Sequence, residues 1–471
     1  MSEPAAWILC ALLAAIFVGA NIANLQLMFK KDAGGSPVML VGGIAGALAI
    51  YVAPVAGVRG YWWVALLIDL GTVPFFLLGF VGIAVEALGS PAFLRRIPLV
   101  RLLVSKAEPA PRDPYPLERA IIGCLLGTAT GDAMGLALEG LSRSRQARIV
   151  GEDMRYRLLF GKGLTSDDTE HTCMVAQALI ETSGYDNDQV EGRFRRNLAW
   201  RLRGWLLLLP AGIGLATLRA ILKLWIGFPP KWSGVHSAGN GPAMRVGIVG
   251  VACAQDMDKA LLITQAATRI THTHPDAETG ALAVMLAARL AALGGEDVRP
   301  GEFLAEFAQH TGHDAGMAEP VRLACESAER GEPAAVFADS IGCEKGVSGW
   351  IRHTVPVVIQ VWLTHQNDFR GAVDSIVRLG GDSDTTAAIV GAIVGARVGR
   401  EGIPGEWLED LREWPRTVAW MERLGRQLAR HRANGTVGKG VPLSLAALAL
   451  RNLLFIPLVL AHGFRRLAPP Y

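Results

Sequence analysis

The chain has few cysteines, and no two of them form a CxxC pair. Its 471 residues include six cysteines, which lie far apart, at Cys10, Cys124, Cys173, Cys253, Cys325 and Cys343. A disulfide framework or a zinc ribbon needs regularly paired cysteines, so the sequence excludes both. The scattered thiols fit a reducing compartment.

Alternating strand patterns are nearly absent between residues 117 and 440. Segments rich in Ala, Leu and Arg at helical spacing dominate instead, as in 171–183, 279–293 and 385–399, with Gly or Pro at their ends. Roughly 320 residues can bury a substantial core. We therefore expect one compact all-α, multi-helix domain over 117–440, with its site built from loops and helix starts.

The greater part of the chain has no net charge. Residues 1–112 hold eight Lys and Arg against five Asp and Glu, whereas the remainder holds 38 of each, so the formal net charge of +3 lies entirely in the N-terminal portion. A neutral domain gives no reason to propose a polyanionic partner. We expect no nucleic-acid partner.

Long apolar stretches are confined to the first hundred residues and two later runs. About 5–29, 38–58 and 62–88 are each long enough to cross a bilayer of about 30 Å. The first stretch has no basic start, which argues against a cleaved signal peptide. Basic residues follow the first and third stretches, so the positive-inside rule places everything after residue 90 in the cytoplasm.

These features predict a membrane partner and a multi-pass location in the inner (cytoplasmic) membrane. Residues 1–104 form the membrane module with about three transmembrane helices, and 105–116 form a proline-rich linker before the cytoplasmic domain. The later apolar runs, 204–228 and 441–464, contain basic residues that are costly inside a single span. We expect both to be core helices. The second, within the C-terminal segment 441–471, could also lie on the bilayer as an interfacial helix.

Two acidic runs lie more than two hundred residues apart, each after a glycine-containing turn and before a small, apolar helical stretch. They read Ser166-Asp167-Asp168-Thr169 and Asp382-Ser383-Asp384-Thr385. If they meet, carboxylates about 4 Å apart repel by roughly 4 kcal/mol per pair at an effective dielectric near 20. A divalent cation relieves that repulsion, and oxygen-only ligands favour Mg²⁺ or Mn²⁺ over Zn²⁺.

The alternative is that both runs are helix N-caps. Ser, Asp and Thr are favoured caps, and Asp167 with Glu170 has the outline of a capping box. Capping explains one Asp per helix but not two in each run, which favours a metal site. Gly391, Gly395 and Gly399 repeat every four residues after the second run, and we expect them to allow close packing of soluble helices around that site.

An ordered set of motifs resembles the ADP-ribosylglycohydrolase family over about residues 117–400. The first is the G-x-x-x-G-x-x-x-G-D-A-x-G-x-x-x-E pattern at 123–139, which ends at Glu139. Four further signatures follow in the family's order: S-D-D-T at 166–169, G-N-G-P-A-M-R at 239–245, H-T-H-P at 272–275 and G-G-D-S-D-T at 380–385.

The resemblance implies an all-α enzyme that removes ADP-ribose from a modified acceptor, using a binuclear site of two Mg²⁺ or Mn²⁺ ions. By residue match, one set of metal ligands is Ser166, Asp167 and Asp168, and the other is Asp382, Asp384 and Thr385. Ser166 stands where the family more often has Thr, and it keeps the hydroxyl oxygen. Asp168 and Glu139 are the candidates for the catalytic acid and base.

The resemblance also implies a substrate-binding set. Asn240 and Gly241 would face the ADP-ribose, with His272 and His274 near its phosphates. Taken alone, the glycine-rich stretch could be only a tight turn, and His-x-His could be a zinc pair. That pair lies mid-chain between helical segments, which disfavours zinc.

The expected function is that of a membrane-tethered hydrolase of ADP-ribosylated protein. Two alternatives stay open: a non-enzymatic ADP-ribose-binding membrane sensor, and a hydrolase of a small ADP-ribosyl compound such as O-acetyl-ADP-ribose. The motifs do not separate Arg, Ser and acetyl linkages.

Overall fold

The computed structural model describes residues 116–151, 153–311 and 316–465, together with residues 7, 9–15, 18, 41–53, 61 and 64. The chain divides into two units, one of residues 1–112 and 212–229 and the other of residues 113–211 and 230–471. Most of the three predicted membrane stretches, and the whole of the third beyond residue 64, lie outside the described residues. Within the second stretch, α2 spans Val41–Val52.

The apolar run 204–228 is not one helix, which corrects the expectation of a single core helix there. It begins inside α9 (Asn187–Leu207) and continues in α10 (Leu215–Trp225), which belongs to the first unit. The two helices are separated because Pro210 cannot continue a helix and Gly212 adopts a φ of 82°.

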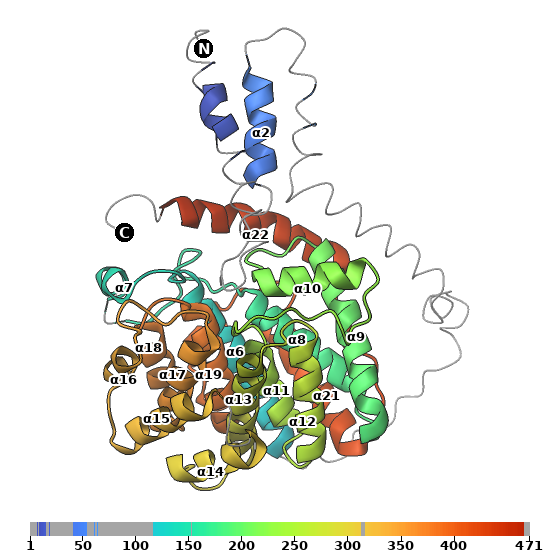
Figure 1. Cartoon of the computed structure of the whole chain (residues 1–471), viewed down its shortest axis with the longest axis vertical. Coiled ribbons are helices and arrows are strands. Elements are labelled where there is room, and N and C mark those ends of the chain that lie inside the picture. The colour runs from blue at the N-terminus through green and yellow to red at the C-terminus, as the bar shows by residue number, and fades with distance from the viewer. Residues whose placement is uncertain are drawn as a thin grey trace, which may run out of the picture. The chain divides into compact units, whose positions relative to one another are not determined.

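The second unit is helical throughout its described residues, as Figure 1 shows. No extended strand occurs among those residues, only isolated bridges between loops. The prediction of an all-α domain is thereby confirmed. Besides α9, its helices are α6 (Pro116–Leu136), α7 (Arg143–Ile149), α8 (Asp167–Ile180), α11 (Ala243–Ala252), α12 (Met257–Arg269), α13 (Pro275–Leu293), α14 (Pro300–Thr311), α15 (Ala318–Glu329), α16 (Ala334–Ser340), α17 (Ile351–Thr364), α18 (Phe369–Val377), α19 (Ser383–Val398), α20 (Gly405–Asp410), α21 (Val418–Asn434) and α22 (Leu445–Arg465).

The core of this unit is built on the contact between α6 and α19, the most extensive between any two of its helices. Glycines line that contact on both sides. A Cβ added at Gly127 would lie 2.0 Å from the carbonyl oxygen of Gly391, and one at Gly123 would lie 2.0 Å from that of Gly395. Since real Cβ atoms do not approach so closely, the helices can touch only because these positions lack side chains. The expected close packing of the glycine repeat is confirmed.

This glycine-lined contact between α6 and α19, here called the glycine seam, places two chain segments at one end of the helix pair. At Gly135, near the end of α6, an added Cβ would lie 2.2 Å from the carbonyl oxygen of Ser383, the first residue of α19. Glu139 follows α6 within a few residues, and Asp382 immediately precedes α19. The glycine seam therefore brings acidic residues from distant parts of the sequence to the same end of the core.

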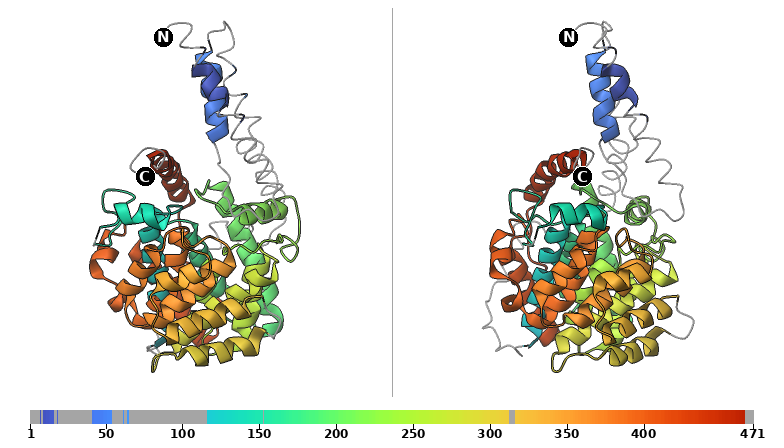
Figure 2. Two further views of the ribbon diagram at one scale, coloured as in Figure 1. Left: turned by 60° about the vertical axis from the view of Figure 1, so that its left-hand side comes forward. Right: turned by 90° about the vertical axis from the view of Figure 1, so that its left-hand side faces the viewer.

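Among the described residues, α22 alone is long and apolar enough to pass a length-and-composition test for a membrane span, over Leu445–Gly463. Only 22% of that stretch is buried. In Figure 1 and in both views of Figure 2, α22 lies across one end of its unit's helices.

Candidate functional site

A double-glycine turn sets the position of the second acidic run. Gly380 and Gly381 have φ angles of 75° and 82°, a left-handed conformation that favours glycine. The Gly381 N–H donates to the Leu141 carbonyl at 2.8 Å, and the Asp382 N–H donates to the Val347 carbonyl at 2.7 Å. The turn is thus held from two sides, and Asp382 leaves it at a fixed point.

The first acidic run is anchored by Asp132, a fully buried carboxylate on α6. Asp132 accepts hydrogen bonds from the Ser166 N–H at 2.9 Å, from the Thr169 N–H at 3.1 Å and from the Thr169 hydroxyl at 2.5 Å. It therefore satisfies the backbone donors at the start of α8 from outside the helix. Burial, the largest influence, raises the pKa of Asp132 to about 7, against the effect of these hydrogen bonds.

The helix-cap alternative does not account for the two acidic runs. Asp132 and the Ser166 side chain cap α8, and Asp382 makes no side-chain cap hydrogen bond at the start of α19. The proposed capping box is absent as well, because the Glu170 carboxylate bonds to Arg416 and Trp205 instead. The aspartates of both runs are consequently available for another role.

The two runs meet through a direct contact. The Thr385 hydroxyl donates to Asp168 Oδ2 at 3.2 Å, and the Ser166 hydroxyl reaches the same oxygen at 3.0 Å. On the other side of the site, Glu139, Asp382 and Asp384 each offer one oxygen, and these oxygens all lie within 4.8 Å of one another. The structure therefore gathers residues separated by more than two hundred positions into one oxygen-rich cluster.

The carboxylates of this cluster repel one another when they are ionised. Burial raises the pKa of Asp168 well above its usual range, and the neighbouring carboxylates of Asp167, Asp132 and Asp382 raise it further. The pKa of Asp384 is raised in the same way, first by burial and then by Glu139 and Asp382. Two nearby anions in a buried site are unfavourable unless a proton or a cation compensates them.

The side chains fit a hard divalent cation. Asp168 Oδ1 and Asp384 Oδ1 are buried and have no hydrogen-bond partner, although such oxygens are normally satisfied. The donors around them are carboxylates and hydroxyls, the ligands that Mg²⁺ and Mn²⁺ prefer. Among the described residues, Glu139, Asp382 and Asp384 are the one set of His, Cys, Asp and Glu side chains close enough to one another to hold a metal ion.

Asn240 lies directly beside this cluster. Its amide Nδ2 donates to Asp382 Oδ2 at 2.7 Å and contacts the Thr354 hydroxyl at 3.0 Å. Its backbone N–H donates to the Gly349 carbonyl at 3.0 Å, which fixes the turn that carries it. Gly241 follows it, half-buried, just before α11 begins.

The two candidate histidines lie in different settings. His272 is buried, with Nδ1 2.9 Å from the Thr271 hydroxyl, and an added Cβ at Gly239 would lie 3.3 Å from its Nε2. Burial, and secondarily Arg245, lowers the pKa of His272 to about 3, so the ring is neutral near pH 7. It therefore sits against the glycine-rich turn that precedes Asn240.

His274 is engaged at the start of α13. Its Nδ1 accepts from the Asp276 N–H at 3.1 Å, and its ring lies 4.7 Å, centroid to centroid, from that of His236. The structure thus gives this side chain a helix-capping contact, which sequence reasoning did not predict. The assignment of both histidines to the phosphates of a substrate stays a prediction.

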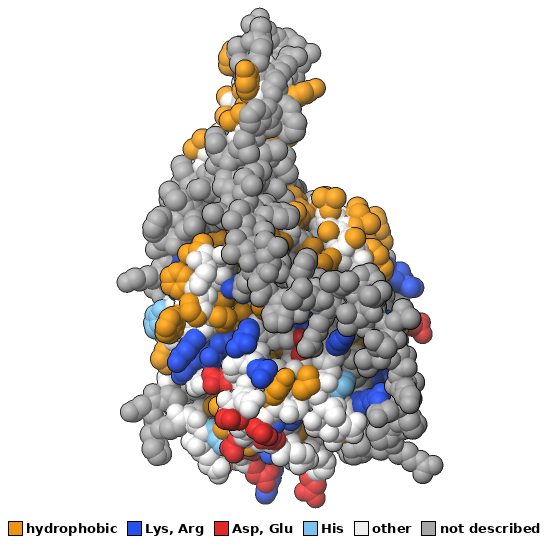
Figure 3. Space-filling model, turned by 90° about the vertical axis from the view of Figure 1, so that its right-hand side faces the viewer, with side chains coloured by type: hydrophobic (Ala, Val, Ile, Leu, Met, Phe, Trp, Pro, Cys, Tyr) orange, Lys and Arg blue, Asp and Glu red, His pale blue; other side chains and the backbone are white. Residues whose placement is uncertain are grey.

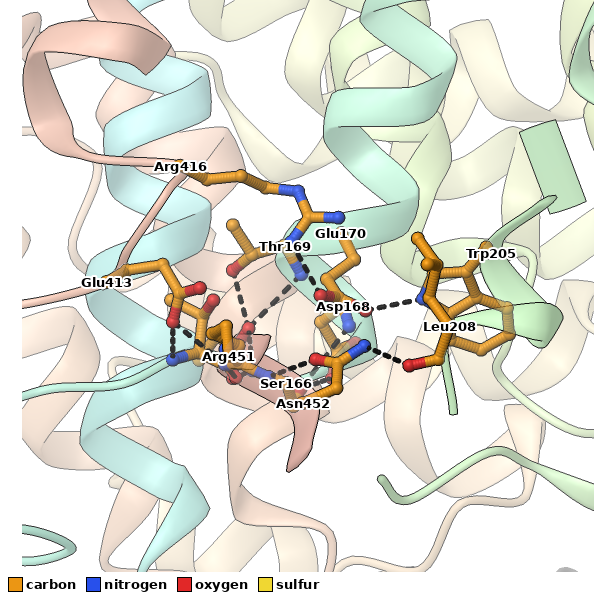
Figure 4. A network of polar contacts seen from close by, with 12 residues as sticks. Ser166, Asp168, Thr169, Glu170, Trp205, Leu208, Glu413, Arg416, Arg451 and Asn452 are labelled. Atoms are coloured by element: carbon orange, nitrogen blue, oxygen red, sulfur yellow. Dashed lines mark hydrogen bonds and ion pairs between the residues drawn. The ribbon is translucent and has the colours of Figure 1, made fainter. Parts of the chain in front are cut away.

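A buried polar network behind the acidic loop was missed from the sequence (Figure 4). Arg416 donates to Glu170 at 2.6 Å, on α8 close to Asp168. Arg451, on α22, donates to Glu413 at 2.8 Å and to the Thr165 carbonyl at 2.6 Å. All four charged side chains are at most 7% exposed.

This network holds the residue that precedes the acidic run. The Thr165 N–H also donates to Glu413, at 3.1 Å, so both backbone groups of Thr165 are bound by the Arg451–Glu413 pair. The available signal was a lone arginine within an otherwise apolar run. Because the sequence does not show that Glu413 is its partner, this arginine indicated only that the run was unsuitable as a membrane span.

The protein is thus an all-α domain with an acidic, oxygen-only site at the starts of two helices. A sequence profile described as ADP-ribosylglycohydrolase matches residues 113–437, more than half of the chain, and the chain belongs to that family of ADP-ribosyl hydrolases. The match ends before α22.

Several characterised and uncharacterised proteins are similar over this region. An uncharacterized protein of Archaeoglobus fulgidus is 31% identical, over 63% of this chain and 93% of that protein. The ADP-ribosyl-[dinitrogen reductase] glycohydrolase of Rhodospirillum rubrum is 25% identical, over 62% and 89% respectively. The ADP-ribosylarginine hydrolase Tri1 of Pseudomonas putida is 28% identical, over 64% and 75%.

Proposed function

We propose that this protein cleaves the glycosidic bond between ADP-ribose and an acceptor side chain of a protein, with two Mg²⁺ or Mn²⁺ ions at the acidic cluster. The contact between Thr385 and Asp168 supports this most directly, because it joins the two acidic runs at one place. Membership of a hydrolase family and the names of two relatives give the type of reaction.

The proposed metal ligands form two sets. One set is Ser166, Asp167 and Asp168, and the other is Asp382, Asp384 and Thr385. Bound ions at such a site orient hydroxyl groups and water and stabilise developing charge. Asn240 supports the second set, since its amide holds one oxygen of Asp382.

Asp168 and Glu139 are the proposed acid and base. Asp168 Oδ2 already accepts from two hydroxyls, and Oδ1 has no hydrogen-bond partner, so one oxygen of this carboxylate could bind an ion while the other exchanges a proton with water. Glu139 is exposed, on the segment that follows α6, and one of its oxygens lies within 4.8 Å of oxygens of Asp382 and Asp384. A carboxylate at either position is within reach of a water or leaving group at the cluster.

The substrate contacts are proposed for the glycine-rich turn and the histidines. Asn240 and Gly241 would face the ADP-ribose, because Asn240 adjoins the acidic cluster. His272 and His274 would lie toward the phosphates, with His272 acting as a neutral hydrogen-bonding group.

The hydrolase proposal is tested by product release from three substrates. The purified full chain with Mn²⁺ is incubated with arginine-ADP-ribosylated protein, serine-ADP-ribosylated protein and O-acetyl-ADP-ribose, and free ADP-ribose is measured. Asp384→Asn should abolish release, whereas Asp339→Asn, at a side chain half exposed on the surface and paired with Arg143, should not. Release from O-acetyl-ADP-ribose alone would show that the substrate is a small ADP-ribosyl compound and not a modified protein. ADP-ribose binding without release from any substrate would refute the hydrolase proposal and favour the sensor.

We also propose that the chain is tethered to the inner membrane with its catalytic domain in the cytoplasm. The support is the three apolar stretches and the distribution of Lys and Arg around them. The full chain should stay with membranes after an alkaline carbonate wash, and a C-terminal tag should be protected in intact cells but digested in inverted vesicles. Recovery in the soluble fraction would refute the tether and would leave the hydrolase proposal unaffected.

A further inference from the structure

One face of α22 is fastened to the helical domain. Phe455 packs with Leu136, Ala137 and Leu158 in a buried hydrophobic cluster. Asn452 donates to the Leu208 carbonyl at 2.8 Å, and Arg451 is held by Glu413 and Thr165 as described above. The polar residues of this helix therefore point inward, which is the reverse of the usual arrangement on a surface helix.

The opposite face of α22 is apolar and exposed. Leu445, Leu450, Leu453 and Leu454 are between 50% and 66% exposed, and Ala446, Ala449 and Pro457 accompany them. The sequence from 445 to 464 contains one charged residue, the buried Arg451, so this outward face carries no charge. Figure 3 shows one face of the molecule, on which exposed hydrophobic side chains gather in patches and most acidic side chains lie apart from them.

The inward contacts of α22 disfavour a bilayer span. A spanning helix would carry Arg451 into hydrocarbon and leave Glu413 without its partner inside the domain, and both outcomes are costly. The length and composition of α22 would suit a span, but the buried contacts of Arg451 do not.

The charge of the surrounding sequence indicates which surface covers this face. Residues 441–471 hold three Arg and not one Asp or Glu, and in the sequence Arg465 and Arg466 follow directly after the apolar run. Basic residues beside an apolar helix face are typical of helices that lie in the interface of an anionic bilayer. The three apolar stretches near the N-terminus would keep the same chain at such a surface.

We propose that the exposed face of α22, defined by Leu445, Leu450, Leu453 and Leu454, lies in the headgroup region of an anionic lipid bilayer. The inference rests on the tether part of the proposed function and not on its hydrolase part. Its consequence is that the helix that meets the lipid also holds Thr165, next to the acidic site, through Arg451.

The test measures the depth of a label on this face in the full chain. Cys10 is replaced by Ser, the other native cysteines being buried, and a bimane fluorophore is attached at Leu453→Cys. The matched control is Val336→Cys on α16, where the side chain is 53% exposed. The proteins are placed in nanodiscs that contain anionic lipid, with quenchers at shallow or deep acyl-chain positions or with aqueous iodide.

We expect shallow lipid quenchers to act on the label at 453 at least about twofold more strongly than deep ones, as an interfacial helix requires. The control label should respond to iodide alone. Equal responses to iodide at both sites would overturn the inference, and so would strongest quenching by deep lipid, which indicates a span. Shielding of the 453 label from both quenchers would also overturn it, because an N-terminal apolar segment or a second copy would then cover the face.

Failure of the tether is separable from failure of this inference. If the full chain enters the nanodisc but the label at 453 is quenched by iodide and not by lipid, only the α22 contact is refuted. A chain that does not enter bilayers would refute the tether. The labelled variant is then mixed with anionic vesicles, where absence of lipid quenching at 453 refutes the α22 contact as well.

Discussion

Gly127→Ala should loosen the acidic site from about the middle of the α6–α19 seam. The new Cβ would lie 2.0 Å from the Gly391 carbonyl oxygen and 2.8 Å from its carbon, both backbone atoms that cannot rotate away. The helices must therefore separate by roughly 1 Å. Overpacking of this kind costs about 1–3 kcal/mol, and the backbone contact puts this case near the upper value.

The expected result has two parts. The Tm should fall by about 3–6 °C, since 1 kcal/mol corresponds to about 2 °C in a domain of this size. Mn²⁺ affinity should fall as well, because the seam sets the distance between the end of α6, before Glu139, and the start of α19, which carries Asp384. Differential scanning calorimetry and isothermal titration of the full chain measure these two quantities.

The control is another glycine-to-alanine change within a helix. Gly192 lies in α9, and an added Cβ there would meet nothing within 4 Å. Gly192→Ala should leave Mn²⁺ affinity unchanged and raise stability by about 0.5–1 kcal/mol, since Ala is the better helix former. An unchanged Tm and an unchanged Mn²⁺ affinity in Gly127→Ala would refute the role given to the seam.

Further changes test the site itself. Asp384→Asn should weaken Mn²⁺ binding at least tenfold, about 1.4 kcal/mol, by calorimetry, and unchanged affinity would remove Asp384 from the ligand set. Asp132→Asn replaces an acceptor of backbone N–H groups and should cost about 1–2 kcal/mol in thermal unfolding, with no change if the cap is dispensable. Arg451→Met leaves Glu413 buried and unpaired and should cost about 3–5 kcal/mol, of which Glu413→Leu in the same chain should restore a part; no recovery would contradict the pairing. Mn²⁺ at a hundred times its Kd should stabilise the fold by about 2.7 kcal/mol, reversed by EDTA, and an unchanged Tm would show that no ion binds the folded state.

The sequence carried the parts of this site that depend on local chemistry. The acidic runs and the glycine turn before Asp382 could be recognised because helix starts and left-handed glycines have short-range signatures. The glycine repeat on α19 predicted close packing, and the structure adds its partner, the matching repeat on α6. Each of these features depends on only a few residues that are neighbours in the sequence.

The features that sequence reasoning missed join distant residues. Asp132 lay inside a recognised motif, yet its role depends on the N–H groups of Ser166 and Thr169, which only the fold brings to it. The Arg451–Glu413 pair likewise joins α22 to the loop after α20. A buried charge is explained by its partner, and spacing along the chain does not reveal a partner in another element.

The seam and the cluster explain each other in physical terms. Carboxylates with raised pKa values would move apart if the backbone allowed it, and a flexible site would relax before any ion arrived. The glycine contacts prevent that relaxation, because α6 and α19 already touch through backbone atoms and their separation would open the core. The repulsion that Glu139 and Asp382 exert on Asp384 is therefore retained in the folded state. A divalent cation bound at the proposed site would gain the relief of that repulsion as binding free energy, without first having to order its ligands.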